Sequence, residues 1–345
     1  MGFMASSHDS LRIAFTGAHQ LELTHENVSA PSANQLLVRT RKTLISTGTE
    51  SIIFTRNFGS GTHWDNWVKY PFYPGYLSAG EVIAVGDEVS DWKVGDRVAS
   101  RSNHRQFHLQ NPNDVLRIPD GVADEDAAWF GLGTITQNGV RKAHHQLGDS
   151  VVIIGLGLLG QLVTQYARIN GASQVIAIDT APMRLEMATS HGATHTLQMG
   201  VAEARERVFE LTEGFGADVV YDVTGHPDVL SPALGLARRF GTLILLGDTG
   251  TPSQQRLSSD VISRGVQIKG AHDVDPPPTR TDWTRWTKPD MARLFFQYLE
   301  RGQMRVNDLV THRYSPTQAL EAFTMLQERR AEAMGVIFDW TQLDG

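Results

Sequence analysis

Hydrophobic and polar residues alternate over short stretches in the first third of the chain. Apolar runs at 11–16, 36–45, 80–86 and 96–101 are bounded by Gly, Asn, Asp and Ser, which is typical of strands joined by turns. Gly-Asp pairs punctuate the stretch 86–98, where they favour further tight turns. This pattern predicts a tightly wound, barrel-like β domain.

The pattern changes near residue 127. From there, strand-length apolar runs alternate with amphipathic stretches of helix length, which favours a parallel sheet wound with helices. The chain is therefore predicted to be α/β, and its 345 residues suffice for two domains with separate cores. The predicted strands are 150–157, 174–179, 218–224, 242–247 and 267–272, and the predicted helices are 160–170, 182–192, 229–241, 291–303 and 315–333.

Composition and charge narrow the range of partners. The net charge is -7 and no long basic run occurs, so there is no electrostatic reason to expect nucleic acid or an anionic membrane. The longest apolar stretch, 151–163, is too short to cross a bilayer and is interrupted by glycines. The chain has no cysteine, which fits a reducing cytoplasm. We expect a cytoplasmic protein with a small-molecule substrate, and neither a nucleic acid nor a membrane partner.

The strongest chemical motif is a glycine-rich turn. Gly155, Gly157 and Gly160 form G-x-G-x-x-G directly after an apolar run and at the start of an amphipathic stretch. In a dinucleotide-binding turn, the first glycine permits the sharp bend, the second lets a pyrophosphate approach the backbone, and the third packs helix against strand. Amide groups at the helix N-terminus would then face the phosphates.

An acidic residue supports the same interpretation. Asp179 ends the next predicted strand, nineteen residues after Gly160, where the ribose of a bound adenosine is expected. Its carboxylate would accept a hydrogen bond from the 2′-hydroxyl and repel a 2′-phosphate, and no arginine follows it immediately. This favours NAD over NADP. The alternative is an ordinary α/β crossover in which Asp179 caps a helix.

These motifs occur in an order that resembles the medium-chain dehydrogenase/reductase superfamily, which is alcohol dehydrogenase-like. GDRV, GLGLLG, YDVTG and LILLG carry the resemblance over nearly the whole chain, and STGTES with PGYLSAGEVIAVG is closest to the zinc-binding dehydrogenase branch that includes bacteriochlorophyllide and polyol dehydrogenases. The resemblance implies a GroES-like β-barrel catalytic domain at 1–127 and 272–345. It also implies a Rossmann NAD-binding domain at 128–271, and a homodimer or tetramer.

The metal does not carry over with the resemblance. Zinc members have ligands at positions that are Thr47, Tyr76 and either Phe130 or Leu132 in this chain. None of these residues is a histidine or cysteine, so we expect no zinc. The several kcal/mol of charge stabilisation that a catalytic zinc supplies must then come from other groups or be unnecessary.

The resemblance implies catalytic roles for four residues. Thr49 matches a hydroxyl that relays a proton between substrate oxygen and cofactor ribose. Tyr76 carries a phenol with an ordinary pKa of about 10, so it would be protonated at neutral pH and able to donate. Thr47 is expected beside the reacting carbon, and His104 is expected to donate to substrate. The structural alternatives are a turn hydroxyl for Thr49, a space-filling ring for Tyr76 and a hydrogen-bonded loop residue for His104.

Cofactor contacts also follow from the resemblance. The strand ends in VTGHP and LLGDTG are expected beside the nicotinamide, and a basic residue five positions after the ribose-binding acid is expected at the ribose. The expected set is Gly155, Gly157, Leu158, Leu159, Gly160, Asp179, Arg184, Thr224, Gly225, Leu246 and Gly247.

Two aromatic loops are candidates for substrate contact. Ring faces cover apolar C–H surface while nearby polar groups bind hydroxyls, which favours a flat or sugar-like substrate. Packing or an interface is the alternative for both loops. The residues are His63, Trp64, Trp67, Tyr70, Phe72 and Tyr73 within 63–76, and Trp283 and Trp286 within 283–286.

The sequence thus predicts a zinc-independent, NAD(H)-dependent oxidoreductase. The first hypothesis is hydride transfer between nicotinamide and a secondary alcohol or ketone, on a polyol, cyclitol or sugar-like compound. A second is reduction of an activated double bond in an enone or quinone-type substrate, which needs less carbonyl polarisation. A third is a non-catalytic NADH-binding sensor or scaffold.

Overall fold

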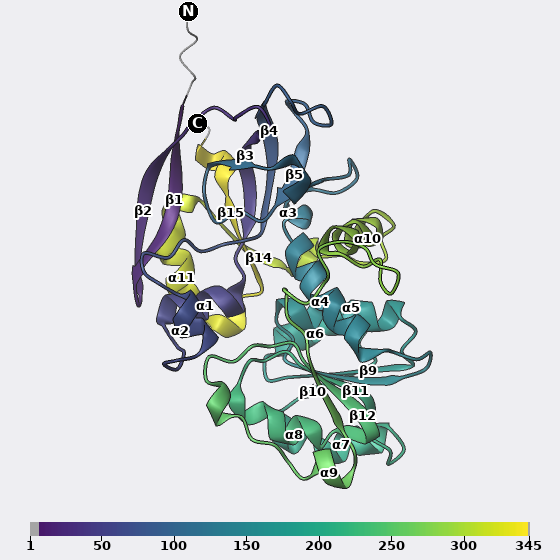
Figure 1. Cartoon of the computed structure of the whole chain (residues 1–345). Coiled ribbons are helices and arrows are strands. Elements are labelled where there is room, and N and C mark those ends of the chain that lie inside the picture. The colour runs from purple at the N-terminus through teal and green to yellow at the C-terminus, as the bar shows by residue number, and fades with distance from the viewer. Residues whose placement is uncertain (1–6, 344–345) are drawn as a thin grey trace, which may run out of the picture. The chain divides into compact units, whose positions relative to one another are not determined.

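The computed structural model describes residues 7–343, which form two compact units (Figure 1). The first contains the described parts of 1–57, 67–131 and 292–345, and the second contains 58–66 and 132–291. After the short segment 58–66, the chain enters the second unit again within α4 (Phe130–Ala143) and leaves it within α10 (Lys288–Glu300). The segment 272–291, expected with the first domain, therefore belongs to the second unit.

The first unit is built on strands. β1 and β2 form an antiparallel hairpin, and a seven-stranded sheet has the order β14-β15-β3-β4-β5-β7, with β6 also paired to β3. Leu36, Val38, Val82 and Val98 pack into one apolar cluster because alternate residues of neighbouring strands share a face. The elements are β1 (His8–Gly17), β2 (Gln20–Val28), β3 (Leu36–Leu44), α1 (Thr47–Thr55), β4 (Ser78–Val85), β5 (Arg97–Ser100), β6 (Phe107–Gln110), β7 (Val115–Arg117), α3 (Asp124–Ala127), β14 (Val310–Tyr314), α11 (Ala319–Glu328), β15 (Gly335–Asp339) and the 3-10 turn η8 (Trp340–Leu343).

The second unit contains a six-stranded parallel sheet with the order β10-β9-β8-β11-β12-β13. In chain order this is 3-2-1-4-5-6, the arrangement of doubly wound dinucleotide-binding folds, in which ligands bind at the carboxyl ends of the strands. The elements are α2 (His63–Trp67), β8 (Ser150–Ile154), α5 (Leu158–Ile169), β9 (Gln174–Asp179), α6 (Pro182–Ser190), β10 (His195–Gln198), α7 (Arg205–Leu211), β11 (Ala217–Asp222), α8 (Leu230–Leu234), β12 (Ala237–Leu245), α9 (Asp260–Ser263) and β13 (Gln267–Gly270).

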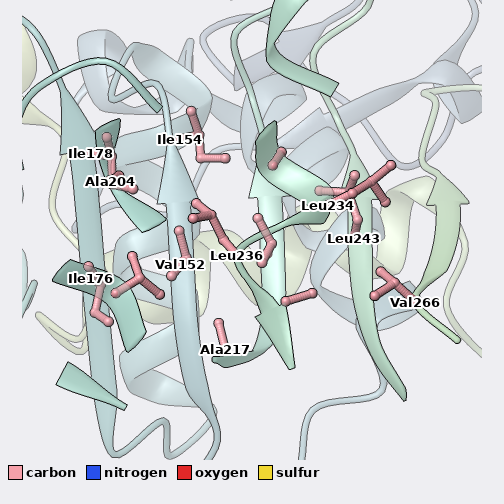
Figure 2. Packing of buried hydrophobic residues seen from close by; sticks show 14 of the residues in the cluster. Val152, Ile154, Ile176, Ile178, Ala204, Ala217, Leu234, Leu236, Leu243 and Val266 are labelled. Atoms are coloured by element: carbon pink, nitrogen blue, oxygen red, sulfur yellow. The ribbon is translucent and has the colours of Figure 1, made fainter. Parts of the chain in front are cut away.

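The apolar strand residues of this sheet are buried on both of its faces. Val152 and Ile154 of β8 lie beside Ile176 and Ile178 of β9, and all four point into one buried cluster (Figure 2). Residues of α7 and α8 complete that cluster, so these helices cover one face of the sheet. The residues between them, such as Ile153, are equally buried on the opposite face. Strands buried on both faces read as continuous apolar runs, which is the pattern of this half of the sequence.

The structure confirms the α/β fold, and it corrects one predicted helix. The stretch 229–241 is helical only through Leu234, after which β12 begins at Ala237. Ala237 pairs with Ala217 of β11, so strand pairing overrides the helical spacing. Farther along, the expected helix start at 315 is a capping box on Ser315, in a 3-10 turn that precedes α11.

Candidate active site

The hydroxyl-rich run TLISTGTES is the end of a strand followed by the first turn of a helix. β3 ends at Leu44 and α1 begins at Thr47, so Ser46 is the residue that precedes the helix. Its side chain makes no capping bond to the helix. Instead, the Ser46 hydroxyl oxygen accepts a hydrogen bond of 2.6 Å from the Tyr76 phenol. The hydroxyls are therefore arranged around Tyr76 and not around a turn.

Tyr76 lies half-buried at the centre of this hydroxyl cluster, which we define as Ser46, Thr49 and Tyr76. Burial raises the pKa of the phenol above its ordinary value, against the opposing effects of hydrogen bonding by Ser46 and Thr49 and of the Arg101 charge. The group is therefore protonated at neutral pH. The cluster presents a proton donor and two further hydroxyls.

A buried acid and histidine lie directly beneath the hydroxyl cluster. Glu50 Oε2 and His104 Nε2 are 2.9 Å apart, and the two side chains are 1% and 0% exposed. Glu50 Oε1 accepts a 2.8 Å bond from the Ser46 backbone N–H. The Glu50–His104 pair therefore holds the backbone of Ser46, whose hydroxyl contacts the Tyr76 phenol.

The second nitrogen of His104 is also occupied. Its Nδ1 is 2.7 Å from Thr43 Oγ1, and the same oxygen accepts a 2.9 Å bond from Trp340 Nε1. Assigned from this network, the Thr43 hydroxyl donates to Nδ1 and the proton on Nε2 is donated to Glu50, so every polar group is paired. Fully buried and bound at both nitrogens, His104 is suited to positioning and not to the direct donation to substrate that we expected.

Gly75 allows the backbone before Tyr76 to pass close to His104. Its φ of +96° is unfavourable for other residues, and a Cβ there would lie 2.7 Å from the His104 backbone nitrogen.

Thr47 differs from Tyr76 in its surroundings, because it is 2% exposed and its hydroxyl accepts a 2.8 Å bond from Arg330 Nη2. Its hydroxyl thus serves a contact within the fold.

The residues at the former ligand positions do not fit a zinc ion. Thr47, Tyr76, Phe130 and Leu132 supply hydroxyls, a phenol and apolar side chains, whereas zinc prefers nitrogen and sulfur ligands. Across residues 7–343, no three His, Cys, Asp or Glu side chains gather as a metal ion would need. The polar side chains among these positions, Thr47 and Tyr76, are hydrogen-bonding groups and not typical zinc ligands.

The glycine-rich turn of the second unit has the geometry of a pyrophosphate-binding loop. Gly155 has a φ of +87°, and a Cβ at Gly160 would lie 2.1 Å from the Gly155 carbonyl oxygen, so both positions require glycine. A Cβ at Gly157 would meet nothing within 4 Å. The structure therefore leaves open the one position that a pyrophosphate approaches. Leu158 and Leu159 follow as the first residues of α5, whose amide groups face this opening.

Asp179 lies at the end of β9 and binds the glycine-rich turn. Its carboxylate accepts hydrogen bonds from the backbone N–H groups of Leu156, at 2.7 Å, and Ala181, at 2.9 Å. Arg184 Nη1 is 3.7 Å from the same side chain. An ionised carboxylate has about four acceptor sites, so the two amides leave acceptor capacity on Asp179. Arg184 therefore lies beside the residue that we expect at the ribose, and its own contact with the ribose stays a prediction.

The loops after β11 and β12 also lie together. The Leu246 and Gly247 N–H groups donate to the Asp222 carbonyl oxygen, at 3.0 and 2.9 Å. The Thr224 hydroxyl donates to the Asp222 carboxylate at 2.7 Å, and a Cβ at Gly225 would lie 2.7 Å from the Asp248 carbonyl oxygen. The four predicted strand-end residues are thus held at the carboxyl ends of neighbouring parallel strands.

The aromatic residues of the loop 63–76 are divided between the two units. His63 and Trp64 belong to the second unit, where His63 Nε2 is 2.8 Å from Asp248 Oδ2. The remaining residues belong to the first unit, where the Tyr70 phenol donates to the Ile53 carbonyl oxygen and Phe72 pairs by backbone with β1. The other members are placed as follows: Trp67 lies edge-on to Phe72, Tyr73 is covered by the Arg12 guanidinium, Trp286 by that of Arg141, and Trp283 is 96% exposed.

Comparison with known families agrees with both units. Residues 32–125 match the family model described as alcohol dehydrogenase GroES-like domain, and residues 159–286 match the one described as zinc-binding dehydrogenase. An L-threonine 3-dehydrogenase of Symbiobacterium thermophilum is 32% identical over 320 residues, covering 83% of this chain and 85% of the relative. The chain belongs to the alcohol dehydrogenase-like medium-chain dehydrogenase/reductase superfamily.

Relatives of this dehydrogenase/reductase differ in their reactions. A sorbitol dehydrogenase of Bacillus subtilis is 32% identical over 301 residues, covering 78% of this chain and 81% of its own, and a quinone oxidoreductase of Pseudomonas aeruginosa is 29% identical over 299 residues, covering 82% and 89%. These proteins are oxidoreductases that act on chemically different substrates. Family membership therefore leaves the substrate to be argued from the residues of the site.

Solved structures share the fold of this dehydrogenase/reductase. An oxidoreductase/dehydrogenase of unknown specificity from Escherichia coli superimposes with a TM-score of 0.82 at 18% identity, covering 96% of this chain and 99% of its own. A short chain alcohol dehydrogenase of Escherichia coli CFT073, complexed with the cofactor NADH, gives 0.78 at 19% identity with coverage of 96% and 99%. No helix within 7–343 is long and apolar enough to span a membrane.

Sequence reasoning missed the roles of Ser46 and Arg101 and the pairing of Glu50 with His104. Ser46 stands inside the quoted hydroxyl run, but only the structure shows that its side chain binds Tyr76. The pairing of Glu50 with His104 joins residues 54 positions apart and has no local pattern. Arg101 is the last residue of a predicted strand, three residues before His104, and this strand-end position was the only signal that could have marked its role.

Proposed function

We propose that this protein is a zinc-independent, NAD(H)-dependent oxidoreductase acting on a secondary alcohol and ketone couple of a polyol, cyclitol or sugar-like compound. The observation that carries the proposal is the hydroxyl cluster of Ser46, Thr49 and Tyr76, in which the phenol is protonated at neutral pH. Because the resemblance matches Tyr76 to a metal-ligand position of zinc relatives, the cluster would supply proton donors in place of that ligand. The glycine-rich turn and Asp179 supply the cofactor half of the proposal.

The roles of the residues follow from their chemistry. When bound, the nicotinamide cofactor supplies or accepts a hydride at the substrate carbon. In reduction, the substrate oxygen needs one proton, which the Tyr76 phenol donates directly or Thr49 relays. The Glu50 and His104 pair holds Ser46 against the phenol and keeps this geometry fixed. Asp179 favours NADH because a 2′-phosphate beside its carboxylate would be repelled.

The activated double bond of an enone or quinone is the second candidate substrate. Two observations favour it: residues 7–343 contain no cluster suited to a metal ion, and a quinone oxidoreductase is among the relatives. An enone needs less polarisation of its carbonyl than an isolated ketone does, so hydrogen-bond donors suffice. A purely NADH-binding sensor is the third candidate. A homodimer or tetramer and a cytoplasmic location stay predictions.

The test is NADH oxidation in the presence of a chelator, against a panel of ketones, keto-sugars and enones. We expect Thr49→Val to reduce turnover more than tenfold with little loss of NADH binding. Thr55→Val is a matched control, because Thr55 lies in the same helix and its hydroxyl bonds only backbone oxygens. Equal turnover by wild type and Thr49→Val would remove Thr49 from the mechanism, and silence of the wild type on the whole panel would favour the sensor.

A further inference from the structure

A guanidinium group lies against the hydroxyl cluster. Arg101 follows β5, and its Cζ is 5.3 Å from the centroid of the Tyr76 ring and 5.6 Å from that of Phe130. Gly131 makes room for it, because a Cβ there would lie 3.2 Å from Arg101 Cζ and 3.4 Å from Nε. The guanidinium is thus packed between two rings and the start of α4.

The position of this charge coincides with the residues that replace metal ligands. In the family resemblance, Tyr76 matches a ligand position of the zinc branch and Phe130 is one of two candidates for another, and both rings lie near the same guanidinium. Guanidinium is always charged in proteins and carries its donors in a fixed plane. The site therefore contains a permanent positive charge in the region where relatives use a cation.

The charge acts on the phenol oxygen in a defined direction. Burial raises the pKa of Tyr76 and prevails, whereas hydrogen bonding with Ser46, the Arg101 charge and hydrogen bonding with Thr49 lower it by stabilising the ionised form. These three groups favour the phenolate that exists once the proton has left. The Arg101 charge in particular stabilises the anion more than the neutral phenol, so its contribution belongs to the step in which charge develops.

We propose that Arg101 supplies the positive charge of this reaction site and stabilises the oxygen anion that forms at Tyr76 during ketone reduction. In this step the phenolic O–H bond breaks, the proton joins the substrate oxygen, and the carbonyl carbon gains the hydride from the cofactor. The Ser46 and Thr49 hydroxyls donate hydrogen bonds to the resulting phenolate and keep their own protons, and a proton taken up from solvent restores the phenol. The proposal rests on the proposed function.

Turnover tests the chemical part of the proposal. Arg101→Met keeps apolar packing between the two rings but removes the charge, and we expect kcat to fall about 100-fold with a smaller change in KM. Guanidinium chloride at millimolar, non-denaturing concentrations should restore part of the activity of Arg101→Ala in a saturable manner. Turnover of Arg101→Met within threefold of wild type would overturn the proposal.

Tyrosine ionisation tests the electrostatic part without any substrate. With 13C-labelled tyrosine and Tyr76→Phe for assignment, the Tyr76 signal should titrate at higher pH in Arg101→Met than in wild type. Arg56→Asn is the matched control, because Arg56 faces Tyr70 in the same manner, at 5.9 Å, outside the cluster. It should shift Tyr70 and leave turnover unchanged. An unmoved Tyr76 signal would overturn the proposal, whereas an inactive wild type would overturn only the proposed function.

Discussion

Alanine substitutions at Gly157 and Gly160 should have different effects, the first on NADH binding and the second on the free energy of unfolding. A Cβ at Gly157 would meet no atom within 4 Å, and the backbone φ of -69° suits alanine. Because Gly157 precedes α5 as its cap, alanine should lower the free energy of unfolding by no more than about 1 kcal/mol. The same methyl group would occupy the space in which we place the pyrophosphate. We expect the Kd for NADH to rise at least tenfold, or about 1.4 kcal/mol.

Gly160→Ala should behave in the opposite manner. The new Cβ would lie 2.1 Å from the Gly155 carbonyl oxygen, and a backbone atom in a tight turn cannot move aside without disturbing β8 and α5. Overpacking of this kind costs about 1–3 kcal/mol, against which a helical alanine regains up to about 1 kcal/mol. We therefore expect Gly160→Ala to lower the free energy of unfolding measurably.

Two measurements distinguish these variants: NADH binding by calorimetry and the free energy of unfolding in urea. Gly200→Ala is a matched control in the same unit, because its Cβ also meets nothing within 4 Å and its φ is -70°. It should leave both quantities unchanged. If Gly157→Ala bound NADH as tightly as wild type while remaining folded, the pyrophosphate would not lie on this turn and our reasoning would be refuted.

Three further predictions concern charged groups. Asp179→Ala should weaken NADH binding and reduce the preference for NADH over NADPH at least tenfold in Kd; a wild type that prefers NADPH would contradict the ribose argument. Glu50→Ala should lower the free energy of unfolding in urea by about 1–3 kcal/mol, because it leaves the His104 Nε2 proton without its acceptor in the interior, and Glu50→Gln should lower it less. Burial, reinforced by neighbouring carboxylates, raises the pKa of Asp126 from 3.8 to about 6, so its protonated form is favoured in the folded state and stability falls as pH rises through that window. The free energy of unfolding of Asp126→Asn, relative to that of wild type, should therefore be larger at pH 7 than at pH 4. A difference between the two proteins that is the same at both pH values would count against this assignment.

The fold was predictable because its signals are local. The runs around Val152 and Ile176 are apolar at every position, as strands buried on both faces must be, and the glycine spacing fixes the turn that follows the first of them. The prediction of a helix over 229–241 was wrong beyond Leu234 because tertiary contacts can override local helix propensity. Its apolar spacing suits a helix, but pairing of Ala237 with Ala217 determines its conformation.

The site was less predictable because its contacts join distant segments. The hydroxyl run marks Thr49, yet only the fold brings Tyr76 to Ser46 and His104 to Glu50. A sequence pattern also carries no information on burial, which is why His104 was expected to reach substrate while it lies fully enclosed. Arg101 was missed because a single arginine after a strand resembles many surface arginines.

The most direct test of the account is hydride transfer itself. Wild-type protein, treated with a chelator, would be given NADH deuterated at C4 together with the panel of ketones, keto-sugars and enones, and products would be analysed by mass spectrometry. The account predicts that one substrate class gains a single deuterium at the reduced carbon and that the chelator has no effect. NADH binding without deuterium transfer to any class, or activity that the chelator abolishes and zinc restores, would contradict it.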